Sequence, residues 1–184
     1  MQIRRVVCGV RSGKSEVLSD QVAPRISEFT TVPGFAATLL WSTSASSTVG
    51  ESAEFKDPTK EADFLPGPGE SRCMVVTFPP DSVMMREEFD GAAFGEEFGK
   101  LIPGLAATFE PDSPGMHTTD SIDYDVVLDG EISVELDDGT EVLLKKYDVA
   151  VQQGGRHAWR NRGTKPATML FVLMGVKRSA GSQS

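Results

Sequence analysis

The chain has 184 residues, of which 39% are apolar and 24% are charged, and it carries a formal net charge of −9. This size and composition fit one globular domain, and the negative charge disfavours binding to nucleic-acid phosphates or to anionic membranes. No apolar run is long enough to span a bilayer, and residues 6–10 are too few for a signal-peptide core. We therefore expect a cytoplasmic protein with neither a nucleic-acid nor a membrane partner.

The first hundred residues give a mixed signal. Two strand-like runs, residues 35–41 and 72–80, flank the polar segment 42–71, which we interpret as a long surface excursion. Residues 86–104 place four apolar side chains at roughly helical spacing, which predicts a helix or two short turns. Three glycines in the same stretch oppose a helix.

The β signal is clear from residue 124 onward. Residues 131–136 alternate strictly between apolar and polar side chains, and the following Asp137-Asp138-Gly139 predicts a turn. Further short runs end with the apolar residues 168–176. Short strands with frequent turns are typical of a sandwich or a closed barrel.

The two histidines of the chain, His117 and His157, both lie in this last third. His117 precedes Asp123 and Tyr124 at the start of an apolar strand that ends at Gly130. In a small barrel, residues from separate strand starts can converge inside. Two imidazoles and a carboxylate in an apolar cavity would form either a transition-metal site or an acid–base site. A lone histidine is more often an ordinary polar residue, but two in such settings favour a functional pocket.

The first of these segments resembles a motif of the cupin superfamily, whose members are small jelly-roll barrels. That motif runs G-x5-H-x-H-x(3,4)-E-x6-G. Counting back from Gly130, Asp123 takes the glutamate position, and His117 and Thr119 take the two histidine positions.

The second segment resembles the other cupin motif, G-x5-P-x-G-x2-H-x3-N. Gly154, His157 and Asn161 match its last glycine, its histidine and its asparagine. The resemblance covers residues 116–176 and is closest to single-domain cupins, some of which act as dehydratases or decarboxylases in polyketide pathways.

The resemblance implies an all-β protein with a single cupin (jelly-roll-like) β-barrel, a short helical segment and N-terminal extension strands. On this interpretation the barrel occupies residues 71–178. Residues 1–70 contribute strands and a long loop to the barrel or to a homodimer contact, and residues 179–184 form a disordered tail.

The resemblance also implies a metal set of His117, Asp123 and His157, with Fe, Zn, Mn or Ni as the candidate divalent cofactor. Thr119 replaces a histidine of the usual set, which would weaken metal binding. The pattern leaves open whether Asp120 or Asp125 takes the place of Asp123, because the inward face of the strand is not fixed by sequence.

Three functions fit these residues. The first is a lyase, a dehydratase or decarboxylase acting on a largely apolar carbonyl compound. His157 or His117 would remove a proton beside the carbonyl, Asp123 would orient the imidazole or protonate a leaving hydroxyl, and Tyr124 would hydrogen-bond an enolate oxygen. The second is an iron-dependent dioxygenase, and the third is a non-enzymatic barrel that binds a small ligand.

Overall fold

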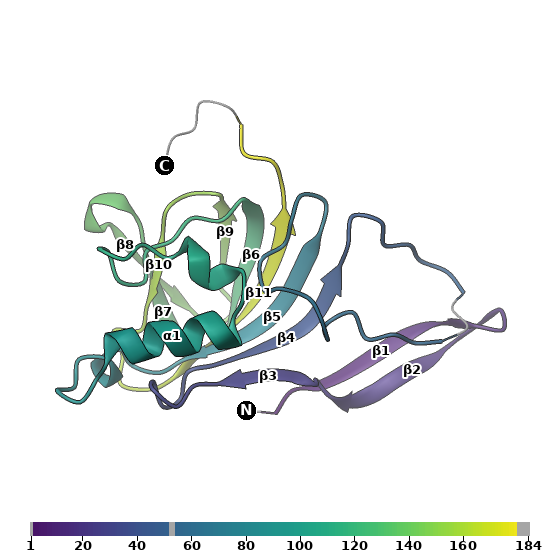
Figure 1. Ribbon diagram of the computed structural model, residues 1–184, viewed down its shortest axis with the longest axis horizontal. Coiled ribbons are helices and arrows are strands. Elements are labelled where there is room, and N and C mark those ends of the chain that lie inside the picture. Colours follow the sequence, from purple (N-terminus) through teal and green to yellow (C-terminus); the bar gives the residue numbers. More distant parts are fainter. Residues whose placement is uncertain (1, 52–53, 180–184) are drawn as a thin grey trace.

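The structure is a computed structural model that describes residues 2–51 and 54–179, and it consists mostly of antiparallel strands (Figure 1). The strands are β1 (Arg4–Arg11), β2 (Lys14–Val22), β3 (Arg25–Glu28), β4 (Ala36–Thr43), β5 (Ser71–Phe78), β6 (Ser121–Asp129), β7 (Glu131–Glu135), β8 (Glu141–Lys145), β9 (Val149–Gln153), β10 (Ala158–Arg160) and β11 (Ala167–Gly175). Helical segments are α1 (Gly91–Leu101) and the short 3₁₀ turns Asp81–Val83, Leu105–Thr108 and Asp137–Gly139. The predicted disordered tail, apart from Ser179, lies outside the described residues.

Two sheets enclose the core. One has six strands in the order β3-β4-β5-β11-β6-β9, and the other has three in the order β10-β7-β8. Trp159 on β10 contacts Phe171 on β11 across the interior, with ring centroids 5.6 Å apart. The arrangement confirms the expected all-β, barrel-like fold. The buried apolar core comprises Phe29, Ala37, Leu39, Phe64, Met74, Val76, Ile102, Val127, Ile132, Ala167, Met169, Phe171 and Leu173.

The inward faces of β6 and β11 differ in chemistry. On β11 every second residue is buried, and the buried side chains are apolar. The same alternation on β6 buries Ser121, Asp123 and Asp125 together with Val127. Since Asp125 lies opposite Phe171 in the register, β6 carries carboxyl groups into an otherwise apolar interior.

The turn between β6 and β7 depends on Gly130, as the sequence predicts. Its φ is +76°, and a Cβ atom at this position would lie 2.7 Å from the carbonyl oxygen of Pro166. Only glycine fits both the backbone conformation and the close approach.

The N-terminal segment has two parts. β3 and β4 join the large sheet, whereas β1 and β2 pair with each other as a separate ribbon that extends from the body of the molecule (Figure 1). The loop between β4 and β5 is not confined to the surface, contrary to expectation. It buries Phe64 completely, and Arg72 holds this part of the loop by donating to the carbonyl oxygen of Asp63 at 2.6 Å.

The predicted helical segment contains one helix, α1, despite its glycines. The Asp90 carboxylate caps it by accepting hydrogen bonds from the amides of Ala92 and Ala93 at 3.0 Å each. Phe98 packs against Phe29 with ring centroids 5.5 Å apart. Tertiary packing of this aromatic face offsets the low helix propensity of glycine. In the part of the chain that the structure describes, no helix is long and apolar enough to cross a membrane.

Candidate active site

The main chain brings the two histidines together. The amide of His117 donates to the carbonyl oxygen of His157 at 2.9 Å, and the amide of His157 donates to the carbonyl oxygen of His117 at 3.0 Å. The two ring centroids lie 4.3 Å apart. Forty residues of sequence thus separate two side chains that a short antiparallel bridge fixes side by side.

The backbone also sets the tautomer of each imidazole. Nδ1 of His117 lies 3.1 Å from the carbonyl oxygen of Gly115, and Nδ1 of His157 lies 2.9 Å from that of Gly155. A carbonyl oxygen can only accept, so each Nδ1 carries the proton. Each neutral ring therefore has its lone pair on Nε2, where it can accept a proton.

Aromatic side chains surround the pair and keep it dry. Phe109 stacks on His117 with centroids 4.5 Å apart, and Trp159 meets His157 edge-on at 6.0 Å. Burial, followed by the neighbouring charge of His157, lowers the pKa of His117 to about 4. Burial also lowers the pKa of His157. Both imidazoles are thus biased towards the neutral, proton-accepting form.

The pKa values of the carboxyl groups on the inner face of β6 are shifted in the opposite direction, upwards. Burial raises the pKa of Asp123 to about 6, although the Thr119 hydroxyl donates to its Oδ2 across 3.5 Å. The Ser121 hydroxyl in turn donates to Thr119 Oγ1 at 2.9 Å. Asp125 is 1% exposed, and neither of its carboxylate oxygens has a hydrogen-bond partner among the residues that the structure describes. Burial and then the charge of Asp123 raise the pKa of Asp125 to about 8.

The structure separates one of the three candidate carboxylates, Asp120, from the other two. Asp123 and Asp125 both face the interior, whereas Asp120 is exposed and pairs with Arg178 at 2.6 Å. Tyr124 lies on the opposite face of β6 and is 46% exposed. It does not share the interior with the histidines, so we do not assign it the enolate-binding role expected from sequence.

The three-ligand metal set is not assembled. Over residues 2–51 and 54–179, neither a hydrogen bond nor an ion pair joins Asp123 to His117 or His157, and no group of three His, Cys, Asp or Glu side chains is disposed to hold a metal ion. Thr119, at the position of a family histidine, is engaged with Asp123 and Ser121. This arrangement does not fit the metal centre that the resemblance implies, and we derive no chemical step through a metal. Whether the protein binds a metal stays a prediction.

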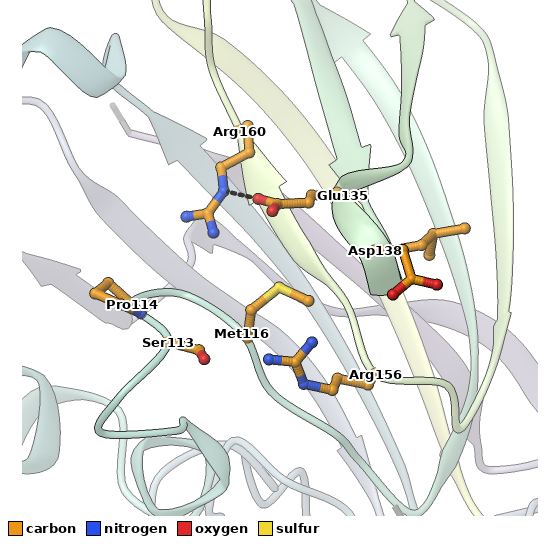
Figure 2. A pocket seen from close by; sticks show the side chains of 9 residues that line it. Ser113, Pro114, Met116, Glu135, Asp138, Arg156 and Arg160 are labelled. Carbon is orange, nitrogen blue, oxygen red and sulfur yellow. Dashed lines mark hydrogen bonds and ion pairs between the residues drawn. The ribbon is translucent and has the colours of Figure 1, made fainter.

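The structure also contains a pocket of about 200 Å³, and Figure 2 shows the side chains that line it. Met116, which precedes His117, lines it together with Arg156 and Arg160. Arg160 pairs with Glu135 at 2.5 Å and Arg156 with Glu110 at 2.6 Å, so acidic partners compensate both guanidinium groups. Arg160 lines this pocket, whereas its neighbour Trp159 packs against the core.

Two features of the site are not predicted by the sequence. One is Phe109, which reaches His117 from a segment with no recognisable strand pattern. The other is the hydroxyl network of Thr119 and Ser121, which is visible only when the inward face of β6 is known. The spacing of Ser121, Asp123 and Asp125 at every second position is a sequence signal that places these polar residues on one face of the strand, but it does not tell which face turns inward.

Two similar sequences come from fungi. Phomopsin biosynthesis cluster protein C' of Diaporthe leptostromiformis is 56% identical over 63 residues, which cover 34% of this chain and 33% of that protein. The cupin-domain-containing oxidoreductase virC of Hypocrea virens is 38% identical over 65 residues, which cover 34% of each chain. The aligned part of the chain is thus similar to a cupin-domain-containing protein, and the two sequence motifs point to the same family.

The match between this chain and its relatives is partial, because the alignments span about a third of the length of those proteins. No protein-family model matches the chain. Among solved structures, the alignment with a cupin 2 conserved barrel domain protein from Salinispora arenicola covers 76% of this chain and 75% of that protein, with 12% sequence identity and a TM-score of 0.38.

Proposed function

We propose that this protein is a small-molecule lyase of secondary-metabolite biosynthesis, a dehydratase or decarboxylase acting on a largely apolar carbonyl compound. The names of the relatives support the pathway class, since they include proteins of phomopsin and oryzine biosynthesis clusters. One observation carries the reaction class. Burial keeps the imidazole pair neutral, with each Nε2 lone pair free, and it biases the two carboxyl groups towards holding their protons.

The proposed dehydration uses one group of each kind. Nε2 of His157 takes a proton from the carbon beside the substrate carbonyl, and Asp123 gives its proton to the leaving hydroxyl. Water departs, and a carbon–carbon double bond conjugated with the carbonyl forms. In a decarboxylation, the substrate loses CO₂ and a protonated side chain then delivers a proton to the enolate carbon. The aromatic walls exclude water from these steps. Phe109 covers His117, so the substrate displaces this ring on entry.

Replacement of the base tests the proposal. We expect His157→Ala to reduce the turnover of β-hydroxy ketones or β-keto acids by about 100-fold or more, the range for loss of a general base. Product formation is measured by ultraviolet absorption of the conjugated carbonyl or by CO₂ release. Arg162→Ala, in an exposed side chain, is the matched control and should retain activity. Equal activity of wild type and His157→Ala, with both proteins folded, would refute the proposal.

A second candidate is an oxidoreductase, which the name of the Hypocrea virens relative favours. It requires a redox cofactor such as iron. Elemental analysis of protein purified without a histidine tag distinguishes the two functions. Under the lyase proposal we expect turnover to persist after exhaustive chelation. Near-stoichiometric iron, together with oxygen consumption that chelation abolishes, would instead assign the protein to the oxygenases.

A further inference from the structure

The inner face of β9 carries a buried polar side chain, Gln152. It is 8% exposed, whereas its neighbours Val151 and Gln153 lie exposed on the outer face. In the ladder between β6 and β9, Gln152 lies directly opposite Asp123. Residues that face each other across an antiparallel pair project to the same side of the sheet. The Gln152 amide therefore enters the interior beside the acid of the proposed reaction.

The Gln152 amide makes no hydrogen bond to any residue in the part of the chain that the structure describes. On the facing strand, Thr119 donates to Oδ2 of Asp123, but Oδ1 has no partner among the same residues. Buried polar groups in folded proteins are nearly always hydrogen-bonded, because each one without a partner costs free energy. The two strands thus present donor and acceptor atoms, side by side, that the protein itself does not use.

The side chains next to these two groups are apolar or small. Leu173 on β11 is the other strand partner of Asp123, and it is 4% exposed. In the neighbouring row of the sheet, Phe171 lies on β11 and Ala150 on β9. Ala150 shares the inner face with Gln152 and adds little bulk beside the amide. A ligand that fits this corner has an apolar body against β11 and an oxygen-bearing group at β6 and β9.

We propose that the Gln152 amide binds the β-hydroxyl group of the substrate and holds it against Oδ1 of Asp123. The hydroxyl oxygen accepts a hydrogen bond from Nε2 of Gln152 with one lone pair and the proton of Asp123 with the other. The carbon–oxygen bond then breaks and water leaves, as His157 removes the proton from the carbon beside the carbonyl. This role rests on the proposed function, because it makes β-hydroxy ketones the substrate class of the same site.

Equilibrium binding of two matched ligands tests this role by calorimetry. The first probe is the β-hydroxy ketone formed from benzaldehyde and acetone, and the second is benzylacetone, which lacks only the hydroxyl group. We expect Gln152→Leu to weaken binding of the hydroxy ketone by roughly 10-fold, the value of one hydrogen bond, and to leave binding of benzylacetone unchanged. Gln153→Leu, on the exposed outer face of the same strand, is the matched control and should bind both probes as the wild type does.

The stability of the same variant separates this role from a structural one. Because the Gln152 amide has no partner within the described residues, Gln152→Leu should not lower the midpoint of urea denaturation. A lower midpoint or an unfolded variant would overturn the proposal, since it would show that the amide holds the fold. Unchanged affinity of folded Gln152→Leu for the hydroxy ketone would overturn it too, and so would a wild type that binds neither probe.

The role of Gln152 and the lyase activity can fail separately. Binding is measured without turnover, so a wild type that binds the hydroxy ketone through Gln152 but never releases water would refute the lyase and keep the role of Gln152. Dehydration with the same kcat and KM in wild type and Gln152→Leu would refute the role of Gln152 and keep the lyase.

Discussion

Asp125 is the residue at which burial and charge conflict most strongly. Its carboxyl group is 1% exposed and has no hydrogen-bond partner in the described part of the chain, and its pKa is raised to about 8. Between the ordinary aspartate pKa and pH 8, the folded protein holds this proton while the unfolded chain releases it. The free energy of unfolding must therefore fall as the pH rises through this range, and the loss is complete above the folded-state pKa.

Asp125→Asn should remove this pH dependence. Between pH 6 and pH 8 we expect the wild type to lose roughly 2 kcal/mol of stability that the variant keeps, because one proton is no longer released on unfolding. Urea denaturation at a series of pH values measures the effect. Asp138→Asn, in an exposed turn, is the control and should parallel the wild type. Parallel curves for wild type and Asp125→Asn would show that Asp125 is already ionised at pH 6.

At the scale of secondary-structure elements, Asn161 joins the end of β5 to the turn between β10 and β11. Its Nδ2 donates to the carbonyl oxygens of Phe78 and Lys165 at 3.0 and 2.9 Å, and its Oδ1 accepts from the amide of Gly163 at 3.0 Å. The side chain is 1% exposed, so water cannot replace these partners. Asn161 matches the asparagine of the second motif. In the structure, its side-chain amide bonds the backbone of both segments.

Asn161→Ala should destabilise the fold by roughly 2–4 kcal/mol, because it leaves buried backbone groups without partners. The midpoint of urea denaturation should fall with little change in slope. Thr164→Ala, in an exposed residue of the same turn, is the control. Asn161→Asp retains the acceptor for Gly163 but loses both donors. This variant should therefore show most of the destabilisation expected for Asn161→Ala. A change below about 0.5 kcal/mol in Asn161→Ala would mean that the turn is stable without the hydrogen bonds of this side chain.

Elements with a strict local pattern were predictable from sequence, and those that depend on distant contacts were not. The strand predicted at residues 131–136 appears as β7, although Ser133 is buried along with Ile132 and Val134. The Asp137–Gly139 turn also appears, and Asp138 and Gly139 adopt positive φ angles of 59° and 73°. The buried course of the loop around Phe64 was not predictable, because one of the arginines that hold it, Arg25, donates to the carbonyl oxygen of Ala62 from 37 residues earlier in the chain. A short strand pattern also left open which face of β6 turns inward.

At the scale of the whole molecule, the motif spacing predicted that the fold would be a barrel with both histidines in its β-rich part. It did not predict the composition of the interior. His117 and His157 meet, but Asp123 bonds with Thr119 and not with either imidazole. A family motif fixes positions along strands, whereas hydrogen-bond partners depend on the side chains actually present. Thr119, in place of an imidazole, redirects the polar contacts towards the carboxyl group.

The bridge between His117 and His157 has a consequence for engineering this scaffold. The bridge is formed by amides and carbonyls alone, so the spacing of the two positions does not depend on which side chains occupy them. Either residue can be exchanged for cysteine, glutamate or a non-natural amino acid while its neighbour keeps its place. The barrel thus offers two neighbouring backbone positions at a fixed spacing, where new functional side chains can be introduced.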